Sequence, residues 1–422
     1  MTEEALVKDF SCMDDYDPNS LPADVALETI KSSISVIRGT EKVAIRSALH
    51  RILDEDIHSS INVPSGTNSA MDGYALSASD IPDSGIKELR VVGTSWAGVP
   101  LKEEISSGEC ARIMTGGLLP AGTDTVVIQE SVERTDDIIK IDSEIRAGDN
   151  VRQAGEDLSI GDLVLAKGCR LTAADLGLLA SLGIGEVNVK RKLRVAFFST
   201  GDELRSIGEQ LDDGSVYDSN RYTLYGMLSR LGCEIIDMGV IRDKKEAVRE
   251  AFLSASEIAD VVISSGGVSV GEADFVKETL DELGKVEFWK VAMKPGRPLA
   301  FGRVKNACFF GLPGNPVSVM VTFYQFVQSA LRKLMGETHT EIMTVKLRCT
   351  SKLKKRPGRL EYQRGIMERD EQGNLTVRKT GAQGSGILSS MTQANCFIVL
   401  PIESSTVEPG MEVEVQPFYG LI

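Results

Sequence analysis

The sequence predicts a multidomain protein of the α/β plus β class, and three observations lead to this prediction. Repeated strand–helix units between about residues 193 and 335 are typical of a three-layer α/β/α domain with a mostly parallel sheet. Short β-type segments separated by Gly and Pro form two further units, at about 61–151 and 341–422. The chain has 422 residues, and a chain of that length usually folds into about three domains.

The N-terminal part contains two segments with helical character that flank a β-rich segment. Apolar residues recur at spacings of three and four between about Pro22 and Asp56, which predicts helix there. A second helix is predicted from Thr172 to Leu182, with Thr172 as its N-cap. The β-rich segment between them is therefore predicted to be an insertion. We expect an elongated, discontinuous helical linker domain of residues 1–60 and 152–190, and an inserted β-rich domain of residues 61–151.

The α/β domain is predicted over residues 191–337. Its strands and helices are expected in alternation at 193–200 (strand), 220–231 (helix), 234–241 (strand), 244–259 (helix), 261–264 (strand) and 274–283 (helix). Gly232 is expected to end the first of these helices. The last domain, residues 338–422, has short alternating segments and predicts a small β-barrel.

Composition excludes several classes of function. The formal net charge of −14 argues against sequence-independent binding of nucleic acid, which relies on clustered Lys and Arg. We read no signal peptide at the N-terminus, and no window reaches the roughly 18 apolar residues of a membrane helix. The seven cysteines are scattered singly. They predict reduced, buried thiols in a cytoplasmic protein.

The three histidines form no metal-ligand spacing with one another or with cysteine, so zinc is not expected. A metal, if the protein uses one, must be held by Asp and Glu. These ligands favour Mg²⁺.

The segment Val261-Val-Ile-Ser-Ser-Gly-Gly-Val-Ser-Val-Gly-Glu-Ala-Asp274 is the most informative part of the chain. A buried strand ends in glycines before a helix, so backbone N–H groups converge on one point, which suits a phosphate. The carboxylates that follow would repel that phosphate unless a cation lay between them. The segment therefore predicts both an anionic ligand and a divalent metal.

Similar small-residue turns follow two other strands, Ser199-Thr-Gly-Asp-Glu203 and Gly311-Leu-Pro-Gly-Asn-Pro-Val-Ser318. Ligands of such sheets bind outside the carboxyl ends of the strands, so three such turns predict one shared crevice. Pro313 and Pro316 fit a rigid structural turn as well as a turn that presents N–H groups to an anion. The sequence leaves these two roles open.

Cations are concentrated in the turn Lys290-Val-Ala-Met-Lys294-Pro-Gly-Arg297-Pro. It is either a solvated charged loop or a clamp for an oxyanion. The basic start of the last domain, which includes Arg359 and Arg364, is either a protected strand edge or a surface that faces a ligand. Asp72, Arg152 and Asp157 flank glycines in turns of the insertion and its junction, where functional loops are common.

In this order, the motifs resemble the molybdenum insertase family, which includes bacterial MoeA and the E domain of gephyrin. The matching segments cover nearly the whole chain: Ser69-Ala-Met-Asp-Gly-Tyr-Ala75, Arg112-Ile-Met-Thr-Gly116, Gly155-Glu-Asp157, Ser199-Thr-Gly-Asp-Glu203, Asp218-Ser-Asn220, Ser264 to Asp274, Lys294-Pro-Gly-Arg-Pro298 and Gly311-Leu-Pro-Gly-Asn-Pro-Val317. The resemblance implies insertion of molybdate into adenylylated molybdopterin, with Mg²⁺-dependent release of AMP, giving molybdenum cofactor.

By matched position, the resemblance implies roles for individual residues. The catalytic residues would be Asp72, Asp157, Glu203, Asp243, Asp274, Lys290 and Lys294, with Glu203 and Asp274 as metal ligands. The substrate-binding residues would be Thr115, Arg152, Ser199, Gly201, Asp218, Asn220, Ser265, Gly266, Gly267, Ser269, Arg297, Pro313, Gly314, Pro316, Ser318, Arg359 and Ser385. Arg297 is a departure, because close bacterial relatives often have Lys there, and a planar guanidinium could alter oxyanion geometry.

The resemblance also implies a cytoplasmic homodimer. The α/β domain of one subunit would form the active site with the insertion and the linker, or dimerisation, domain of the other, so that Asp72 and Arg152 would serve Asp274 in trans. A molybdopterin adenylyltransferase and apo-molybdoenzymes are candidate partners, and neither nucleic acid nor a membrane is expected. Two alternatives remain at this stage, a molybdopterin adenylyltransferase and a non-catalytic scaffold that binds a partner peptide.

Overall fold

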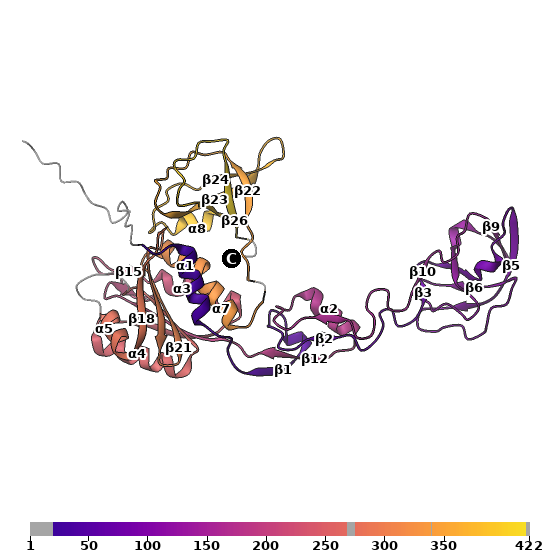
Figure 1. The fold of residues 1–422 in the computed structure, drawn as a ribbon, viewed down its shortest axis with the longest axis horizontal. Coiled ribbons are helices and arrows are strands. Elements are labelled where there is room, and N and C mark those ends of the chain that lie inside the picture. The colour runs from indigo at the N-terminus through magenta and orange to yellow at the C-terminus, as the bar shows by residue number, and fades with distance from the viewer. Residues whose placement is uncertain (1–19, 268–274, 339, 419–422) are drawn as a thin grey trace, which may run out of the picture.

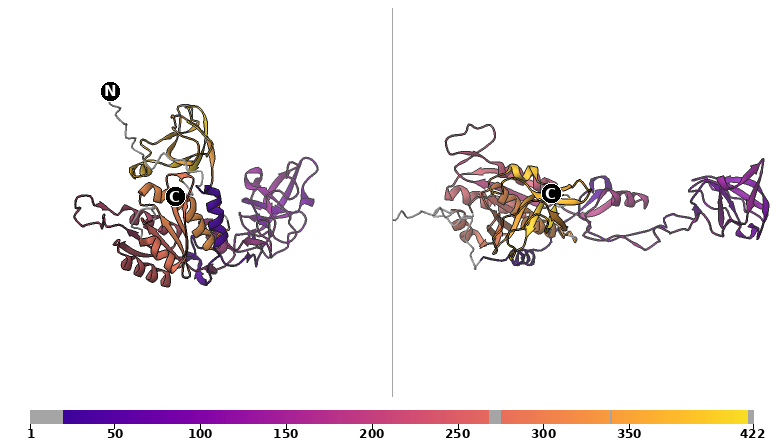
Figure 2. Two further views of the ribbon diagram at one scale, coloured as in Figure 1. Left: turned by 60° about the vertical axis from the view of Figure 1, so that its left-hand side comes forward. Right: turned by 90° about the horizontal axis from the view of Figure 1, so that it is seen from above.

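The computed structural model describes residues 20–267, 275–338 and 340–418. An α/β domain and a C-terminal β-barrel lie together, and a long arm leads from them to the inserted domain (Figure 1). The right-hand view of Figure 2, from above, also shows the arm extended. The predicted fold class, multidomain α/β plus β, is confirmed. The boundaries predicted for the domains stay predictions.

The α/β domain is built on a six-stranded sheet in the order β16-β13-β17-β21-β20-β18. The first four strands are parallel, β20 runs antiparallel to β21, and β18 runs antiparallel to β20. The carboxyl ends of β16, β13, β17, β21 and β18 therefore meet at one edge. The strands are β13 (Arg194–Thr200), β16 (Glu234–Ile241), β17 (Val261–Ser265), β18 (Gly284–Lys290), β20 (Pro298–Val304) and β21 (Ala307–Leu312).

Helices cover both faces of this sheet, because its strands carry apolar side chains on both sides. On β13, Val195 and Phe197 belong to one core and Ala196 and Phe198 to the other, as the two-residue period of a strand requires. The helices of the domain are α3 (Ser219–Leu231), α4 (Lys245–Ile258), α5 (Phe275–Leu283), α6 (Pro316–Thr322), a π-helical segment η4 (Phe323–Val327) and α7 (Gln328–Leu334). Gly232 ends α3 in the left-handed conformation, as predicted.

The predicted N-terminal helix is shorter than expected. Helix α1 (Ala23–Ser33) ends at Ile34, which is extended, and residues predicted to be helical beyond it form β1 (Thr40–Ala44). The prediction was wrong there because β1 pairs with β12 (Glu186–Lys190), more than 140 residues further along the chain, and tertiary pairing overrode the local pattern. Helix α1 packs into the core of the α/β domain, where Ala26 and Ile30 are fully buried.

The arm begins with the linker domain. It contains α2 (Ala173–Ser181), which starts with the predicted N-cap at Thr172 and a capping box formed with Asp175. Its other elements are the β1–β12 pair, the 3₁₀ turn η1 (Ile45–Ser47), and the pair β2 (Ile57–His58) and β11 (Leu163–Leu165). Leu53, Leu171, Leu179 and Val189 are fully buried in its core, so this domain has a core of its own.

The inserted domain at the end of the arm is a mixed six-stranded sheet in the order β7-β4-β6-β5-β9-β8. These strands are β4 (Gly73–Leu76), β5 (Ile86–Ser95), β6 (Glu109–Ile113), β7 (Thr125–Ile128), β8 (Glu133–Thr135) and β9 (Ile138–Asp142). Short turns η2 (Ala78–Asp80) and η3 (Gln129–Ser131) connect them, and the pair β3 (Asn68–Ser69) and β10 (Val151–Arg152) joins the domain to the arm.

The C-terminal domain is a closed barrel of five strands, as predicted. The strands β22 (Val345–Cys349), β23 (Leu360–Arg369), β24 (Leu375–Lys379), β25 (Cys396–Leu400) and β26 (Glu412–Pro417) form a ring that closes between β23 and β25. Helix α8 (Ser389–Gln393) packs against β23. The short strand β19 (Met293–Lys294) comes from the α/β domain and pairs with β23, so the two domains share a sheet.

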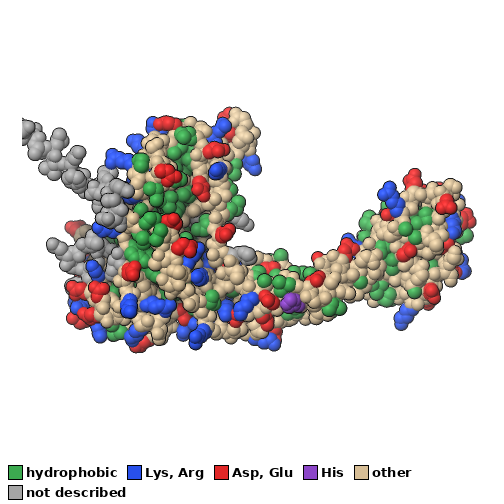
Figure 3. All heavy atoms as spheres, viewed as in Figure 1, with side chains coloured by type: hydrophobic (Ala, Val, Ile, Leu, Met, Phe, Trp, Pro, Cys, Tyr) green, Lys and Arg blue, Asp and Glu red, His purple; other side chains and the backbone are tan. Residues whose placement is uncertain are grey.

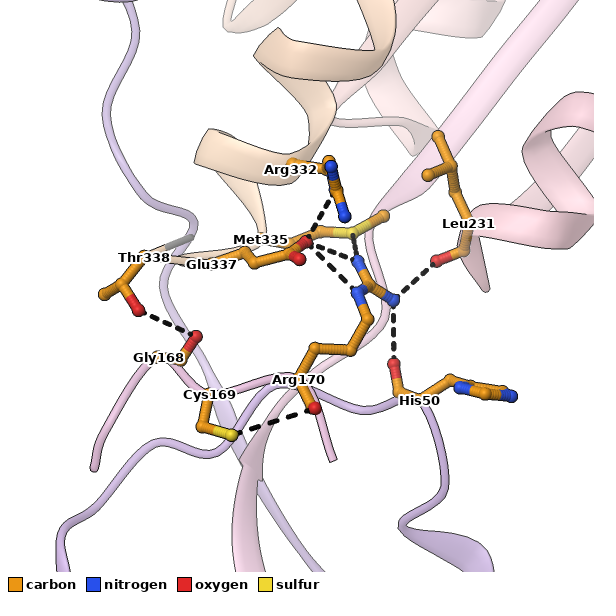
Figure 4. A network of polar contacts seen from close by, with 9 residues as sticks. All are labelled: His50, Gly168, Cys169, Arg170, Leu231, Arg332, Met335, Glu337 and Thr338. Carbon is orange, nitrogen blue, oxygen red and sulfur yellow. Dashed lines mark hydrogen bonds and ion pairs between the residues drawn. The ribbon is translucent and has the colours of Figure 1, made fainter. Parts of the chain in front are cut away.

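A network of polar contacts fastens the arm to the α/β domain (Figure 4). Arg170 of the linker domain donates to the Glu337 carboxylate from Nε and Nη2, at 3.1 and 2.7 Å, and to the carbonyl oxygen of His50 at 2.9 Å. Arg332, from α7, donates to the same Glu337 oxygen at 3.1 Å. One buried carboxylate thus binds two guanidinium groups from two domains, which restrains the direction of the arm.

Within the described ranges, no helix is long and apolar enough to cross a membrane. All six cysteines of those ranges are free, and five of them are buried. Acidic and basic side chains are interspersed over the face shown in Figure 3, so the net negative charge is not gathered into one patch there.

Candidate functional site

The carboxyl edge of the α/β sheet brings together the three small-residue turns predicted from the sequence. Ser199 pairs in register with Ser265, and Ser265 with Leu312, so the turns that follow β13, β17 and β21 begin side by side. The Ser-Gly-Gly turn after β17 lies at the centre of this edge. Ser269 and Asp274, which were predicted to belong to the site, lie outside the described residues.

Gly266 shows why this central turn needs glycine. Its φ is +92°, and a Cβ atom placed there would lie 2.7 Å from the carbonyl oxygen of Thr200. Both the backbone conformation and the close approach of the neighbouring strand exclude a side chain. The backbone of the turn is therefore bare, as the approach of a phosphate to N–H groups requires.

Several buried polar atoms around this edge have no hydrogen-bond partner among the described residues. They are Ser199 Oγ, Thr200 Oγ1, Asp218 Oδ2, Asn220 Oδ1 and Ser264 Oγ. Buried polar groups are almost always paired, so such atoms in one region mark a strained or ligand-binding site. The sequence predicted Ser199, Asp218 and Asn220, whereas Thr200 and Ser264 were not assigned a role.

Asn220 ties the components of the edge together. Its Nδ2 donates to Ser265 Oγ at 2.9 Å and to the carbonyl oxygen of Gly314 at 2.7 Å. Asp218 caps the start of α3 by accepting from the backbone N–H of Arg221. Because Asn220 lies in the first turn of α3, this helix is anchored to both glycine-containing turns.

An acidic group occupies the side of the edge that follows β13 and β16. The Glu203 carboxylate folds back over Gly201, where a Cβ atom would lie 2.6 Å from Oε2. The backbone N–H of Asp243 donates to Asp202 Oδ1 at 3.4 Å. Burial raises the pKa of Asp243, and the negative charges of Asp202 and Glu203 raise it further. Crowded carboxylates of this kind would be relieved by a cation.

The described residues contain no group of three or more His, Cys, Asp or Glu side chains arranged to hold a metal ion. Of the two predicted metal ligands, Glu203 lies in the acidic group, and Asp274 is outside the described residues. Oxygen ligands such as those of Asp202, Glu203 and Asp243 match the donor set that Mg²⁺ prefers.

The opposite side of the edge is basic. The turn with Lys290, Lys294 and Arg297 connects β18 to β20, and the backbone N–H of Val291 closes it by donating to the Arg297 carbonyl at 2.7 Å. Burial lowers the pKa of Lys355 in the barrel, the carboxylates of Glu361 and Glu403 raise it, and the positive charges of Arg359 and Lys294 lower it. Arg359 of the barrel and Lys294 of the α/β domain therefore act on the same lysine, whose surroundings also contain two carboxylates.

The turn Pro313–Pro316 leads directly into α6, with Pro316 at its first position. The backbone N–H of Val317 donates to the carbonyl oxygen of Ser385 at 3.0 Å, and Ser318 is buried. The structure thus brings Ser385, which the sequence separates from Pro316 by almost 70 residues, to the same turn.

Arg364 is a buried cation whose importance the sequence did not reveal. It is only 1% exposed. Its Nε donates to Ser390 Oγ and its Nη2 to the carbonyl oxygen of Gly384, each at 3.0 Å. Burial lowers its pKa to about 10, so it stays charged at neutral pH. The only sequence signal was a single Arg in the mixed segment Leu360-Glu-Tyr-Gln-Arg364, and the sequence treated it as one member of a basic patch.

The remaining predicted residues lie on the inserted domain and on the chain segments that join it to the linker domain. Asp72 Oδ1 accepts from the backbone N–H and the Oγ1 of Thr115, at 2.7 and 2.9 Å. These hydrogen bonds lower the pKa of Asp72. Arg152 pairs with Asn68 between β10 and β3, and both Arg152 and Asp157 are exposed. Asp72 and Thr115 are thus in direct contact.

The arm and the sheet edge are well separated within one chain (Figure 1). The predicted site residues therefore fall into two groups. One group surrounds the edge of the α/β sheet. The other lies on the inserted domain and on the chain segments that join it to the linker domain. A single site that uses both groups needs residues from two copies of the chain.

Three family models of known proteins match successive parts of the chain. Residues 21–183 match the family described as MoeA N-terminal region (domain I and II). Residues 196–333 match the family described as probable molybdopterin binding domain, and residues 346–418 the MoeA C-terminal region (domain IV).

Individual relatives match over nearly the full length. The chain is 48% identical to the molybdopterin molybdenumtransferase of Haemophilus influenzae over 385 residues, covering 91% of this chain and 95% of that protein. It is 35% identical to gephyrin of Dictyostelium discoideum, covering 94% of this chain and 62% of that protein. The crystal structure of the molybdopterin biosynthesis MoeA protein of Pyrococcus horikoshii is 31% identical, with a TM-score of 0.83, covering 94% of this chain and all of that one.

Proposed function

Because this chain belongs to the MoeA family, we propose that it is a molybdopterin molybdenumtransferase that inserts molybdate into adenylylated molybdopterin and releases AMP. The proposal rests on the family relationship and on one structural observation. Along the carboxyl edge of the sheet, charge changes from acidic after β13 and β16, through the bare Ser-Gly-Gly turn, to basic after β18. That order suits a phosphoanhydride in the middle with a cation on one side and an oxyanion on the other.

We propose that the central turn and the hydroxyl groups around it hold the phosphate-containing part of the substrate. Ser199, Ser265 and Gly267 would orient it through hydroxyl and backbone N–H donors. Gly266 would leave space for it, and Asn220, whose Nδ2 donates to Ser265 and Gly314, would position the turns. The rigid turn Pro313–Pro316 would support the same ligand through the Gly314–Asn220 hydrogen bond. These residues bind and position, which is most of what phosphoryl chemistry asks of a protein.

Mg²⁺ is proposed as the cation on the acidic side. Glu203 and Asp274 would hold it, with Asp243 nearby. Once bound, the ion would offset the phosphate charge that develops as the anhydride is cleaved. The raised pKa of Asp243 among its neighbours supports a cation-binding role for this group.

Molybdate is proposed to bind on the basic side as a substrate. Lys290, Lys294 and Arg297 belong to the turn between β18 and β20. Arg364 supplies a buried positive charge close to Ser385, because it donates to the carbonyl oxygen of the preceding residue, Gly384. Guanidinium and ammonium groups bind tetrahedral oxyanions through charge-assisted hydrogen bonds. Arg359 and Ser318 are kept as further candidates for this pocket.

We propose that the protein acts as a homodimer whose site is completed in trans. Asp72, Thr115, Arg152 and Asp157 lie on or beside the inserted domain and the β3–β10 pair, and the separation of these elements from the sheet edge (Figure 1) supports this arrangement. A cytoplasmic location is proposed as well. The six free cysteines of the described ranges are compatible with a reducing compartment.

The decisive experiment measures AMP release from adenylylated molybdopterin with molybdate and Mg²⁺. The wild-type protein should release AMP, and Glu203→Gln or Asp274→Asn should abolish the Mg²⁺-dependent part while circular dichroism shows an intact fold. Wild-type turnover by both variants would refute the metal assignment.

The same protein incubated with molybdopterin and ATP tests the first alternative, because an adenylyltransferase would form the adenylylated product. Binding of a partner with no AMP release would favour the scaffold. The match to the linker, inserted and barrel regions favours the transferase, since adenylyltransferases resemble only the α/β domain.

A further inference from the structure

The inserted domain exposes apolar side chains on its turns at residues 69–72, 96–99 and 114–118. Trp96 is 53% exposed and Val99 67%, and Met71 and Leu118 are exposed by 45% and 39%. Figure 3 shows hydrophobic side chains at the surface of this domain, at the far end of the arm. A tryptophan left this exposed is uncommon on a surface without a binding role, because burial of its ring contributes more than that of most side chains.

Hydrogen bonds hold Trp96 in a fixed relation to Asp72. Residues 96–99 form a tight hairpin closed by two backbone hydrogen bonds between Trp96 and Val99, at 3.1 and 3.0 Å. Ser95 Oγ donates to the carbonyl oxygen of Leu118 at 2.7 Å. The N–H of Met114 donates to the carbonyl oxygen of Ser95 at 3.2 Å. The turn from Met114 to Leu118 carries Thr115, which donates twice to Asp72. Trp96 and Asp72 therefore belong to one connected group of turns.

The size of this patch favours a small planar ligand over a protein partner. A stable protein interface buries about 800 Å² on each side, and four scattered apolar side chains around a polar turn do not provide a surface of that kind. An aromatic platform beside a hydrogen-bond acceptor is instead the usual arrangement for a flat heteroaromatic ring with N–H groups. Asp72 offers such an acceptor within the same connected group of turns as Trp96.

We propose that Trp96 stacks on a planar heteroaromatic ring of the adenylylated substrate while that substrate is bound at the sheet edge of a second copy. The ring is either the adenine or the pterin, which share this chemistry. The inference rests on the proposed function and its shared site, and it adds a ring-binding role for a residue outside the predicted site. Val99, which pairs with Trp96 across the hairpin, borders the platform.

Fluorescence tests ring binding without turnover. The chain has two tryptophans, and Trp289→Phe leaves Trp96 as the single reporter. Titration with AMP, with pterin-6-carboxylate and with ribose 5-phosphate separates the two rings from a ring-free control. Saturable quenching by at least one ring compound and none by ribose 5-phosphate is expected. Failure of both ring compounds to quench the fluorescence would overturn the proposal. Quenching that depends on protein concentration alone would also overturn it, because it would assign Trp96 to a contact between copies of the chain.

Kinetics tests the contribution to the reaction. Trp96→Ala should raise KM for adenylylated molybdopterin roughly tenfold or more, in line with base–aromatic stacking, with little change in kcat. Trp96→Phe should restore most of the loss. Ile86→Ala is the matched control, because Ile86 is an exposed apolar residue (70%) at the opposite end of β5 in the same domain. It should behave as wild type.

The two failures are distinguishable. An active wild type together with Trp96→Ala at the wild-type KM would overturn the role of Trp96 and leave the proposed function intact. A wild type that releases no AMP would overturn the proposed function, and the titration with ring compounds would then decide ring binding on its own.

Discussion

Arg170 and Glu337 connect two domains through a buried ion pair with Nη2 2.7 Å from Oε2, and Glu337 is 9% exposed. Arg332 shares the same carboxylate oxygen. The pair lies where the arm meets the α/β domain (Figure 4). Two positive charges here depend on one negative charge, so Glu337 is the more sensitive member of the network.

The first prediction concerns this ion pair. Glu337→Gln should destabilise the protein by about 3 kcal/mol, because two largely buried guanidinium groups lose their counter-charge. Urea unfolding measures the change. The control is Glu186→Gln, which breaks the exposed Lys42–Glu186 pair at 3.0 Å and should cost less than about 1 kcal/mol. Equal effects of the two substitutions would contradict a special role for Glu337.

The second prediction tests the shared site. Asp72→Asn and Glu203→Gln should each be inactive alone, whereas a mixture allowed to exchange subunits should regain activity. Each mixed dimer contains one intact site, so equal mixing should restore up to about a quarter of wild-type AMP release. If both residues served the site of their own chain, every site would carry one defect. A mixture as inactive as its components would therefore exclude assembly in trans.

The third prediction concerns the central turn. Gly266→Ala should cost about 1–2 kcal/mol, because its positive φ is strained for an L-residue and its Cβ would press on the Thr200 carbonyl. AMP release should fall much further, since the substrate phosphate needs that space. Gly314→Ala is the control, because a Cβ there meets no atom within 4 Å and should leave the stability unchanged within about 0.5 kcal/mol. Thermal unfolding and turnover are measured on both.

The fourth prediction concerns the buried Arg364. Arg364→Met keeps the side-chain volume and removes a buried charge that has no carboxylate partner among the described residues. Stability should fall by about 1–3 kcal/mol, because the Gly384 carbonyl and the Ser390 hydroxyl lose their hydrogen bonds to Arg364. Saturation with molybdate should require at least about tenfold more of the anion. An unchanged molybdate dependence would remove Arg364 from the pocket.

The fifth prediction concerns pH. Burial raises the pKa of the Cys110, Cys233 and Cys396 thiols from about 9 to about 12. In the unfolded chain these thiols ionise near their ordinary pKa, so their contribution to stability is present below about pH 9 and is lost as pH rises towards 12. Cys233→Ala should weaken the decline, by up to about 1.4 kcal/mol per pH unit above about pH 10, where the unfolded thiol is almost fully ionised. Urea unfolding between pH 8 and 10.5 measures it, and a variant with the wild-type slope would contradict the prediction.

Sequence patterns identified much of the α/β domain because its signals are local. The apolar run of β13 predicts a strand buried on both faces, Gly232 ends α3 as expected, and Thr172 caps α2. Each of these features depends on a few neighbouring residues. The segment after Ser33 failed for the opposite reason, because β1 forms only through its partner β12.

The candidate site divides in the same way. Gly266 could be singled out because a glycine turn after a buried strand carries a local signal, and Asn220 because it lies in a segment that resembles the family's. The exposed Trp96 and the buried Arg364 could not be, since exposure and burial are set by what packs around a side chain. A Trp in a loop and an Arg in a basic stretch look ordinary in sequence.

The sequence by itself determined the family, the order of the domains and which strand ends carry small-residue turns, because these properties are written in contiguous residues. The tertiary structure decided that α1 packs with the α/β domain, that Glu337 fastens the arm, and that acidic and basic turns lie on opposite sides of one edge. It also separated the inserted domain, which carries Asp72, from that edge. Such relations join residues far apart in the chain, and only packing and strand pairing bring those residues together or keep them apart.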